Sequence, residues 1–298
     1  MQQINNEHEN LARQLEATGN YKILRRLISR LPTPTPADYS DKIGLIIDCE
    51  TTGTDSTKDE IIEIAILKFR FTDGDLITGV ADTFESFNQP SMPIPANIVE
   101  LTGITDEMVA GRSIDAALLE AFVADADIVI AHNAGFDRKF AERSWEIFAH
   151  KAWACSMSEV DWRLHGFGGT KLEYLLTDAG YFHDAHRAIG DCHATLELLA
   201  RPLPATSKTA FEMLMGRARR KTFRVWAQNS PYDLKDVLKR RGYRWSDGTN
   251  GWPRSWRIDV DEDMRDAELD YLRQEIYQRD VDIDCREITS LDRFSNRV

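Results

Sequence analysis

A short apolar run that ends in two acids constrains the fold of this chain most. Residues 43–53 read IGLIIDCETTG, and the apolar part is rich in β-branched side chains and too short for a typical helix, which predicts a buried strand. Side chains alternate between the two faces of a strand, so Asp48 and Glu50 are expected on one face, about 7 Å apart. Two carboxylates this close raise each other's pKa unless a cation lies between them. Oxygen ligands at this spacing favour Mg²⁺ or Mn²⁺ over zinc.

Two further motifs follow, and they matter because acids at strand ends are common by chance. HNAGFD (132–137) comes after a second apolar run, and HRAIGD (186–191) stands at the head of an expected helix. The order D-x-E-x-T-G, N-x-x-F-D, H-x-A-x-x-D resembles the DEDDh branch of the DEDD 3′-to-5′ exonucleases. That group includes the proofreading subunit of bacterial replicative polymerase, RNase T and oligoribonuclease. The resemblance covers residues 43–200 and fills all five positions of the family.

The resemblance implies a metal-dependent active site. Asp48, Glu50, Asp137 and Asp191 would hold two divalent cations, Mg²⁺ or Mn²⁺, on either side of the scissile phosphate. His186 would take the proton from the attacking water, a role that suits the ordinary imidazole pKa of about 6.5. Taken singly, His186 reads as a surface-loop histidine and Asp137 as an acid that the helix dipole favours. The assignment therefore depends on the five residues together.

The resemblance also implies contacts with a substrate. The backbone at Thr51 and Thr52 would contact the terminal 3′-hydroxyl, and Leu101 would wedge against the last base. Asn133 is expected to order the turn before Asp137. Phe136 has two readings, because it either stacks on a base or fills the core.

Other histidines and the cysteines are predicted to be structural. His132 and His193 are expected to make structural contacts, and Cys49 and Cys192 to be small core residues. The four cysteines include no C-x-x-C pair, which argues against a zinc site or a disulfide framework and predicts reduced thiols.

The order of the expected elements indicates an α/β fold. Three strands in meander order precede alternating helix and strand, which is the order of an RNase H-like mixed sheet flanked by helices. The predicted strands cover residues 43–53, 61–71, 81–90 and 127–133. The predicted helices cover residues 113–124, 136–148, 171–181 and 191–203. The first two acidic motifs are then expected at the carboxyl edge of the sheet, where α/β proteins usually place their sites.

Proline-containing segments divide the chain into three parts. Residues 1–40 are expected to form a helical arm, with Leu and Ile at helical spacing up to residue 31, followed by a proline-rich linker. The nuclease domain is predicted over residues 41–203. Residues 207–298 follow a second linker and show the order β-α-β-β-α-β, which predicts a smaller α+β domain of the ferredoxin-like type.

Basic charge is concentrated in one part of the chain. The net charge is −12, yet residues 207–257 hold 13 Lys and Arg against 4 Asp and Glu. Aromatic side chains beside cations suit single-stranded nucleic acid, although basic runs often form a solvated face and tryptophans often fill cores. The candidate nucleic-acid patch comprises Arg219, Arg220, Lys221, Arg224, Trp226, Lys239, Arg240, Arg241, Trp245 and Trp252.

Three functions agree with these observations. The leading hypothesis is a metal-dependent 3′-to-5′ exonuclease that hydrolyses phosphodiester bonds at single-stranded 3′ ends of DNA and releases nucleoside 5′-monophosphates. The alternatives are an exoribonuclease that trims RNA 3′ ends or short oligonucleotides, and a non-catalytic nucleic-acid-binding adaptor. The intact set of five residues weighs against the adaptor. A polar N-terminus and the absence of an apolar run of about 18 residues predict a cytoplasmic protein without a membrane segment.

Overall fold

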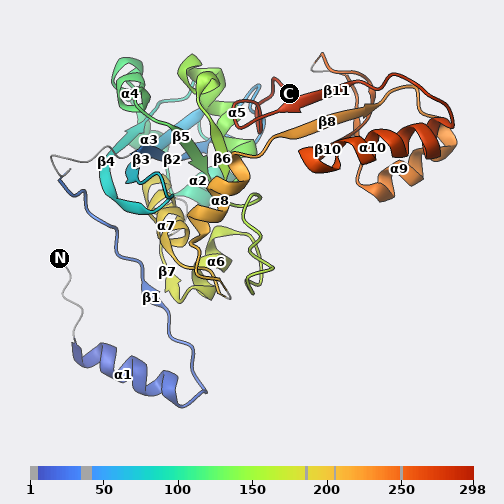
Figure 1. Ribbon diagram of the computed structural model, residues 1–298. Coiled ribbons are helices and arrows are strands. Elements are labelled where there is room, and N and C mark those ends of the chain that lie inside the picture. The colour runs from blue at the N-terminus through green and yellow to red at the C-terminus, as the bar shows by residue number, and fades with distance from the viewer. Residues whose placement is uncertain (1–5, 35–41, 185–186, 205, 249–250) are drawn as a thin grey trace.

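The fold is an α/β body from which a smaller sheet domain projects (Figure 1). This domain, residues 222–288, is called the arm from here on. The computed structural model describes residues 6–34, 42–184, 187–204, 206–248 and 251–298. The body is built on a sheet with the strand order β4-β3-β2-β5-β6. These strands are β2 (Lys42–Thr51), β3 (Ile61–Phe71), β4 (Ile77–Phe87), β5 (Ile128–Ala131) and β6 (Trp153–Cys155). The first three form an antiparallel meander and the last two run parallel to β2, which confirms the predicted RNase H-like mixed sheet.

Helices cover both faces of this sheet (Figure 1). One face is covered by α6 (Leu172–Asp178), α7 (Ala188–Ala200) and α8 (Ala210–Ala218). The other face is covered by α4 (Ala116–Val123) and α5 (Ala134–Ser144). The short helices α2 (Ala96–Thr102) and α3 (Asp106–Val109) and a 3-10 helix at Glu146–His150 lie in the connections. Two apolar cores therefore enclose one sheet, as an α/β body requires.

The N-terminal segment differs from the predicted continuous helix. The helix α1 (Asn6–Ala17) is followed by Gly19 at φ 75°, a conformation that stops a helix. Arg25–Arg26 then forms the short strand β1, which pairs in parallel with β7 (Tyr181–Phe182). The prediction of helix up to residue 31 was therefore wrong, because pairing with a remote strand prevails over local helical spacing. Most of the predicted proline-rich linker, residues 35–40, lies outside the described residues.

Short strands account for the other differences in the body. The sequence did not indicate β1, β6 or β7, which span two or three residues each. β4 begins earlier than predicted because Ile77 already pairs with Phe71 across the turn. Strands this short carry no alternation pattern of their own, so their partners define them.

The arm has the predicted order β-α-β-β-α-β. Its four strands pair antiparallel in the order β11-β8-β10-β9. They are β8 (Thr222–Ala227), β9 (Arg244–Ser246), β10 (Ser255–Asp261) and β11 (Cys285–Ile288). The helices are α9 (Lys235–Arg241) and α10 (Arg265–Tyr271), the latter continued by a π-helix at Leu272–Tyr277. Both pack on one face of the sheet around Val225 and Leu272, which leaves the other face without helices.

The chain leaves the body and returns to it. The helix α8, which the prediction placed in the C-terminal domain, belongs to the core of the body, where Phe211 packs edge-on against Phe69 and Phe71 with ring centroids 5.5 and 5.1 Å away. After β11, the backbone N–H of Trp153 donates to the carbonyl of Ser290 (2.8 Å), and Phe294 packs on the second core. We propose 222–288 as the bounds of the C-terminal domain.

None of the helices in the described ranges combines the length and the apolar character that crossing a bilayer needs.

Candidate active site

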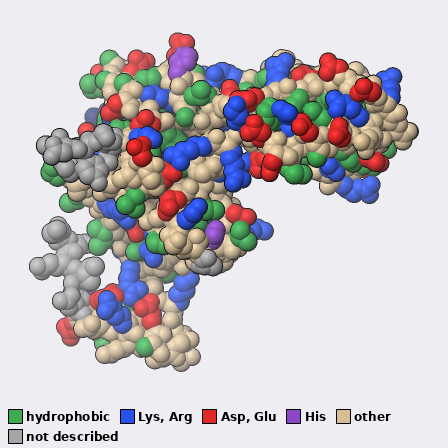
Figure 2. Space-filling view, viewed as in Figure 1, with side chains coloured by type: hydrophobic (Ala, Val, Ile, Leu, Met, Phe, Trp, Pro, Cys, Tyr) green, Lys and Arg blue, Asp and Glu red, His purple; other side chains and the backbone are tan. Residues whose placement is uncertain are grey.

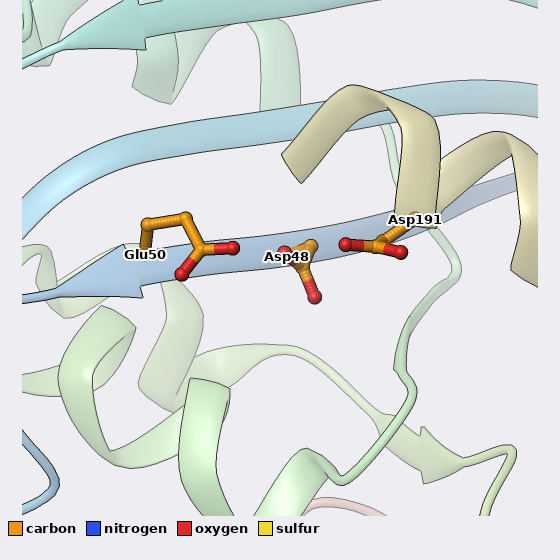
Figure 3. Close-up of side chains that lie close together, drawn as sticks. All are labelled: Asp48, Glu50 and Asp191. Carbon is orange, nitrogen blue, oxygen red and sulfur yellow. The ribbon is translucent and has the colours of Figure 1, made fainter. Parts of the chain in front are cut away.

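Three carboxylates from two elements meet at one point on the sheet. Alternation along β2 places Asp48 and Glu50 on the same face as Ile46, which is the face that α7 covers. The first turn of α7 carries Asp191. Oxygens of the three carboxylates lie within 4.8 Å of one another. Figure 3 shows the side chain of Asp48 between the other two, with Asp191 reaching down from its helix toward the strand.

Asp137 approaches the same strand from the other side. It lies in the first turn of α5, only 3% exposed, and its Oδ1 accepts a hydrogen bond from the backbone N–H of Cys49 (3.0 Å). The turn before α5 depends on Asn133, whose φ of 94° and ψ of 51° are left-handed values that Asn tolerates better than most residues. The structure therefore brings the four predicted acids together, three in the close group and Asp137 beside them.

Burial and mutual repulsion disfavour the charged form of these acids. Burial, reinforced by Asp191 and Glu63, raises the pKa of Glu50 to about 7. Burial raises the pKa of Asp137 to about 8, even though the N–H of Cys49 lowers it. The pKa of Asp48 is also raised well above its usual range, first by burial and then by Asp137 and Asp191.

This donor set fits a divalent cation. All the donors are carboxylate oxygens, which are the ligands that hard cations prefer. Their spacing of under 4.8 Å allows shared coordination. A bound cation would favour the charged forms of these acids and so oppose the burial and the mutual repulsion that raise their pKa values.

The third motif is described only in part. His186, the predicted general base, lies outside the described residues. His183, which the sequence analysis did not single out, is nearly buried, and its Nε2 lies 2.6 Å from Oδ1 of Asp191. The available signal was a second histidine shortly before the motif, in the segment FHDAHR.

Glu63 is a further acid that the sequence analysis missed. It lies on β3 directly opposite Glu50 and is 4% exposed. Its carboxylate accepts hydrogen bonds from the backbone N–H of Ala188 and from the Arg187 guanidinium, both 3.3 Å. Glu63 thus holds the first turn of α7, which carries Asp191. A single acid inside the apolar run IIEIAILKF was the signal that could have revealed it.

The predicted substrate-binding residues lie around the acids in different environments. Thr51 is buried and its hydroxyl donates to the carbonyl of Gly53 (2.5 Å), while the hydroxyl of Thr52 accepts from the N–H of Glu60 (2.9 Å). Leu101 is 53% exposed on α2, and Asn133 is exposed at the start of α5. Phe136 is half-buried, with its ring 4.9 Å from that of Phe140. One side of Phe136 therefore belongs to the core.

Three of the residues expected to be structural, His132, Cys49 and Cys192, have such environments, whereas the buried Nδ1 of His193 has no hydrogen-bond partner among the described residues. His132 lies with Nδ1 2.8 Å from Oγ of Ser156 and Nε2 2.9 Å from the carbonyl of Thr170, and burial lowers its pKa. Cys49 and Cys192 are buried free thiols.

The predicted basic patch does not form one surface. Arg224 and Trp226 lie on β8, on the helix-free face of the arm, whereas Lys239, Arg240 and Arg241 lie on α9, on the covered face.

Four members of this patch form ion pairs within the protein. The pairs are Arg219 with Asp75, Lys221 with Glu287, Arg224 with Asp259, and Arg241 with Glu268. Trp226 is 1% exposed and stacks on Trp252 with ring centroids 5.3 Å apart. Trp245 is 52% exposed, and Arg220 is exposed as well.

Comparisons with known proteins agree with the geometry of the site. The family model described as exonuclease (RNase_T) matches residues 45–199. The DNA polymerase III PolC-type protein of Listeria monocytogenes is 40% identical over 165 residues, which cover 53% of this chain and 11% of that protein. The PolC-type protein of Bacillus subtilis is 40% identical over 168 residues, again 53% of this chain and 11% of that protein. The match thus spans about a tenth of the length of these polymerases.

Solved exonuclease structures also match. Exonuclease X in complex with 5′ overhanging duplex DNA is 25% identical with a TM-score of 0.45, over 58% of this chain and 98% of that one. The zinc-bound form of the E. coli ExoI–ssDNA complex is 16% identical with a TM-score of 0.47, over 74% of this chain and 63% of that one. Since the family model covers just over half of the sequence, the chain belongs to the exonuclease family, as a DEDDh-type 3′-to-5′ exonuclease with an RNase H-like fold.

Proposed function

We propose that this protein hydrolyses phosphodiester bonds at single-stranded 3′ ends of DNA and releases nucleoside 5′-monophosphates. The observation that carries the proposal is the group of Asp48, Glu50 and Asp191 with oxygens within 4.8 Å, with Asp137 beside it. The choice of DNA draws on the matched relatives, which are named as DNA polymerases. We place the activity in DNA replication or repair, and the cytoplasmic location stays a prediction.

We propose that the four acids hold two ions of Mg²⁺ or Mn²⁺. When bound, such cations lower the pKa of a water and stabilise the charge that develops on the leaving 3′ oxygen. The chain supplies fixed oxygens, because β2 and α5 hold Asp48, Glu50 and Asp137 on regular elements. Glu63 holds the helix turn of Asp191.

We assign the proton transfer to His186, on the strength of its place in the third motif. An imidazole near its ordinary pKa is available as a base close to neutral pH. The backbone at Thr51 and Thr52 follows the two strand acids directly and is proposed to contact the terminal 3′-hydroxyl. The exposed side chain of Leu101 suits a wedge against the last base. The exposed edge of the Phe136 ring is proposed to form a wall that contacts the nucleotide.

Digestion of end-labelled strands tests this proposal. Single-stranded DNA, duplex DNA and RNA, each labelled at either end, are incubated with the protein and Mg²⁺ or Mn²⁺. We expect a 3′ label to be released at once as a mononucleotide from single-stranded DNA, and a 5′ label to remain on a shortening ladder. Asp48→Asn is the matched control and should release nothing.

Three results would contradict the proposal. Faster digestion of RNA than of DNA would favour the exoribonuclease. An intact 3′ label in all substrates would favour the adaptor. Digestion by Asp48→Asn at the wild-type rate would refute the assignment of the site.

A further inference from the structure

Two adjoining hollows lie between the body and the arm. Their volumes are about 990 Å³ and 560 Å³. Lys139 of α5 and Arg257 of β10 line both hollows, so one continues into the other. The first hollow is also lined by Asn133 and Phe136, which lie four residues and one residue before Asp137 of α5. A continuous groove therefore leads from the second acidic motif to the sheet of the arm.

The groove opens onto the helix-free face of that sheet. Residues directly opposite each other in an antiparallel pair share a face. Arg244, Arg257 and Trp226 form one row across β9, β10 and β8. Arg224 and Arg286 lie opposite each other on β8 and β11, in the next row on the same face. The face thus carries four arginines, and Arg224, Arg244 and Arg257 line the second hollow.

The cations along the groove differ in their partners. Arg224 is neutralised by Asp259 through two hydrogen bonds of 2.7 and 2.8 Å. Across the described ranges, by contrast, no carboxylate forms an ion pair with Lys139, Arg244 or Arg257. Burial, together with the neighbouring Arg224, lowers the pKa of Arg257. An anion in the groove would relieve this repulsion.

The overall charge of the chain makes this placement of cations unusual. The protein carries a net charge of −12, so its average surface repels polyanions. Figure 2 shows Lys and Arg side chains, with Asp and Glu side chains among them, where the arm leaves the body. Local cations on an acidic protein concentrate a polyanion at that place.

We propose that this groove holds the nucleic-acid strand that leads to the 3′ end, with Lys139, Arg257 and Arg244 contacting its phosphates. The inference rests on the proposed function for the direction of the strand, with the 3′ end at the acids. Contacts to phosphates alone make binding independent of base sequence. Trp226 and Trp252 stack on each other. We do not expect a base to stack on Trp252, because the Arg286 guanidinium already lies over this ring, 4.8 Å from its centroid.

Binding measured without hydrolysis tests this inference. Fluorescence anisotropy of a labelled single strand of about 16 nucleotides, in EDTA, gives Kd over a series of salt concentrations. Arg244→Gln combined with Arg257→Gln is expected to weaken binding and to reduce the slope of log Kd against log salt by about 1.4, since about 0.7 is lost with each phosphate contact. Lys139→Gln alone is expected to reduce the slope by about 0.7. Arg244→Lys combined with Arg257→Lys keeps both charges and should keep the wild-type slope.

The matched control is Lys239→Gln combined with Arg240→Gln, which removes two exposed cations from α9 on the covered face of the arm. This control should bind like the wild type. Equal losses in both double variants, or weaker binding with an unchanged slope in the groove variant, would overturn the inference. Circular dichroism establishes whether each variant is folded. If the Arg244→Gln, Arg257→Gln double variant is not folded, the salt slope of Lys139→Gln tests the inference instead.

The two proposals can fail separately in these measurements. A wild-type chain that binds the strand in EDTA through the groove but releases no nucleotide with Mg²⁺ would refute the proposed activity alone. A chain that digests DNA, but whose groove variants bind with the wild-type Kd and slope, would refute the groove alone.

Discussion

At the scale of residues, the fold holds the acids of the site in positions that disfavour their charged forms. Asp137 and Glu50 are enclosed by the sheet and by α5 and α7, in a place that favours their protonated forms. The fold keeps them there because Cys49 and the alternation of β2 fix their positions. The site therefore stores repulsion that a divalent cation would relieve.

The raised pKa values of these acids, caused first by burial, predict a dependence of stability on pH. The pKa of Glu50 rises from 4.5 to about 7 on folding, and that of Asp137 from 3.8 to about 8. Groups with a raised pKa contribute stability that is fully present below about pH 4 and is lost as the pH rises through the folded-state values. The Tm of the metal-free protein, followed by circular dichroism, should therefore fall from about pH 5 to about pH 8. Asp137→Asn should show a shallower fall.

Metal ions should reverse this trend. At about pH 8, Mg²⁺ or Mn²⁺ should raise the Tm, because the cation binds the ionised acids of the folded state only. The rise should shrink toward about pH 5, where protons compete for the same oxygens. A metal-free Tm that increases between these two pH values would contradict the raised pKa values.

We expect different roles for His183 and His186, the two histidines that precede Asp191 in the sequence. His186→Ala should lower kcat by about 10²-fold to 10⁴-fold, because the general base is lost. His183→Ala should lower activity by only about tenfold, because it removes a contact that orients Asp191. Release of a 3′ label at saturating Mg²⁺ measures both. A loss in His183→Ala as large as in His186→Ala would transfer the role of the base to His183.

At the scale of elements, the position of α7 depends on an acid of the neighbouring strand. Glu63 accepts from the N–H of Ala188 at the start of this helix. Glu63→Ala should lower the free energy of unfolding by about 1 kcal/mol relative to Glu63→Gln, because glutamine keeps an acceptor for that N–H. Urea denaturation of the two variants measures the difference. Equal stabilities would show that this hydrogen bond does not hold the helix.

Long elements with a clear pattern could be predicted from the sequence, and so could the site residues that they carry. The alternation of β2 places Asp48 and Glu50 on one face, and the order of the arm follows from its strands and helices. The segment around Arg25 could not be predicted, because its conformation depends on β7, far away in the chain. Glu63 was overlooked because its role depends on a helix turn that only the folded chain brings to it.

The basic patch shows the same limit for charge. Arg219 and Arg241 read as free cations in the sequence, but Asp75 and Glu268, their acidic partners, come from distant parts of the chain. Conversely, Lys139 and Arg257 lie far apart in the sequence and line one groove. Composition located the basic region, but only the fold decides which of its charges remain available.

At the scale of the whole molecule, the returning C-terminal segment stabilises the body. Arg138 is 0% exposed, follows Asp137 directly in the sequence, and donates to the carbonyls of Ser290, Leu291 and Arg293 at 3.2, 2.7 and 2.6 Å. It also pairs with a carboxylate of its own helix.

Arg138→Ala should therefore be strongly destabilising. We expect the free energy of unfolding to fall by about 3–5 kcal/mol, because a buried ion pair is broken and three carbonyls each lose the hydrogen bond from Arg138. Arg273→Ala, which removes two more exposed ion pairs on the arm, is the control and should cost less than about 1 kcal/mol. Denaturant titrations compare them. Similar small costs for both variants would mean that the returning segment contributes little to the body.

The arm joins the body through two neighbouring strands, and Thr222 and Ile288 at its base lie directly opposite each other. Two neighbouring strands, β8 and β11, resist twisting of the arm relative to the body better than a single flexible linker would. If the groove holds the strand as proposed, we expect this double attachment to keep the arm at a fixed distance from the acids and so to set the length of strand that reaches both. Digestion should slow abruptly once the remaining strand is too short to reach the arm, leaving an end product of uniform length.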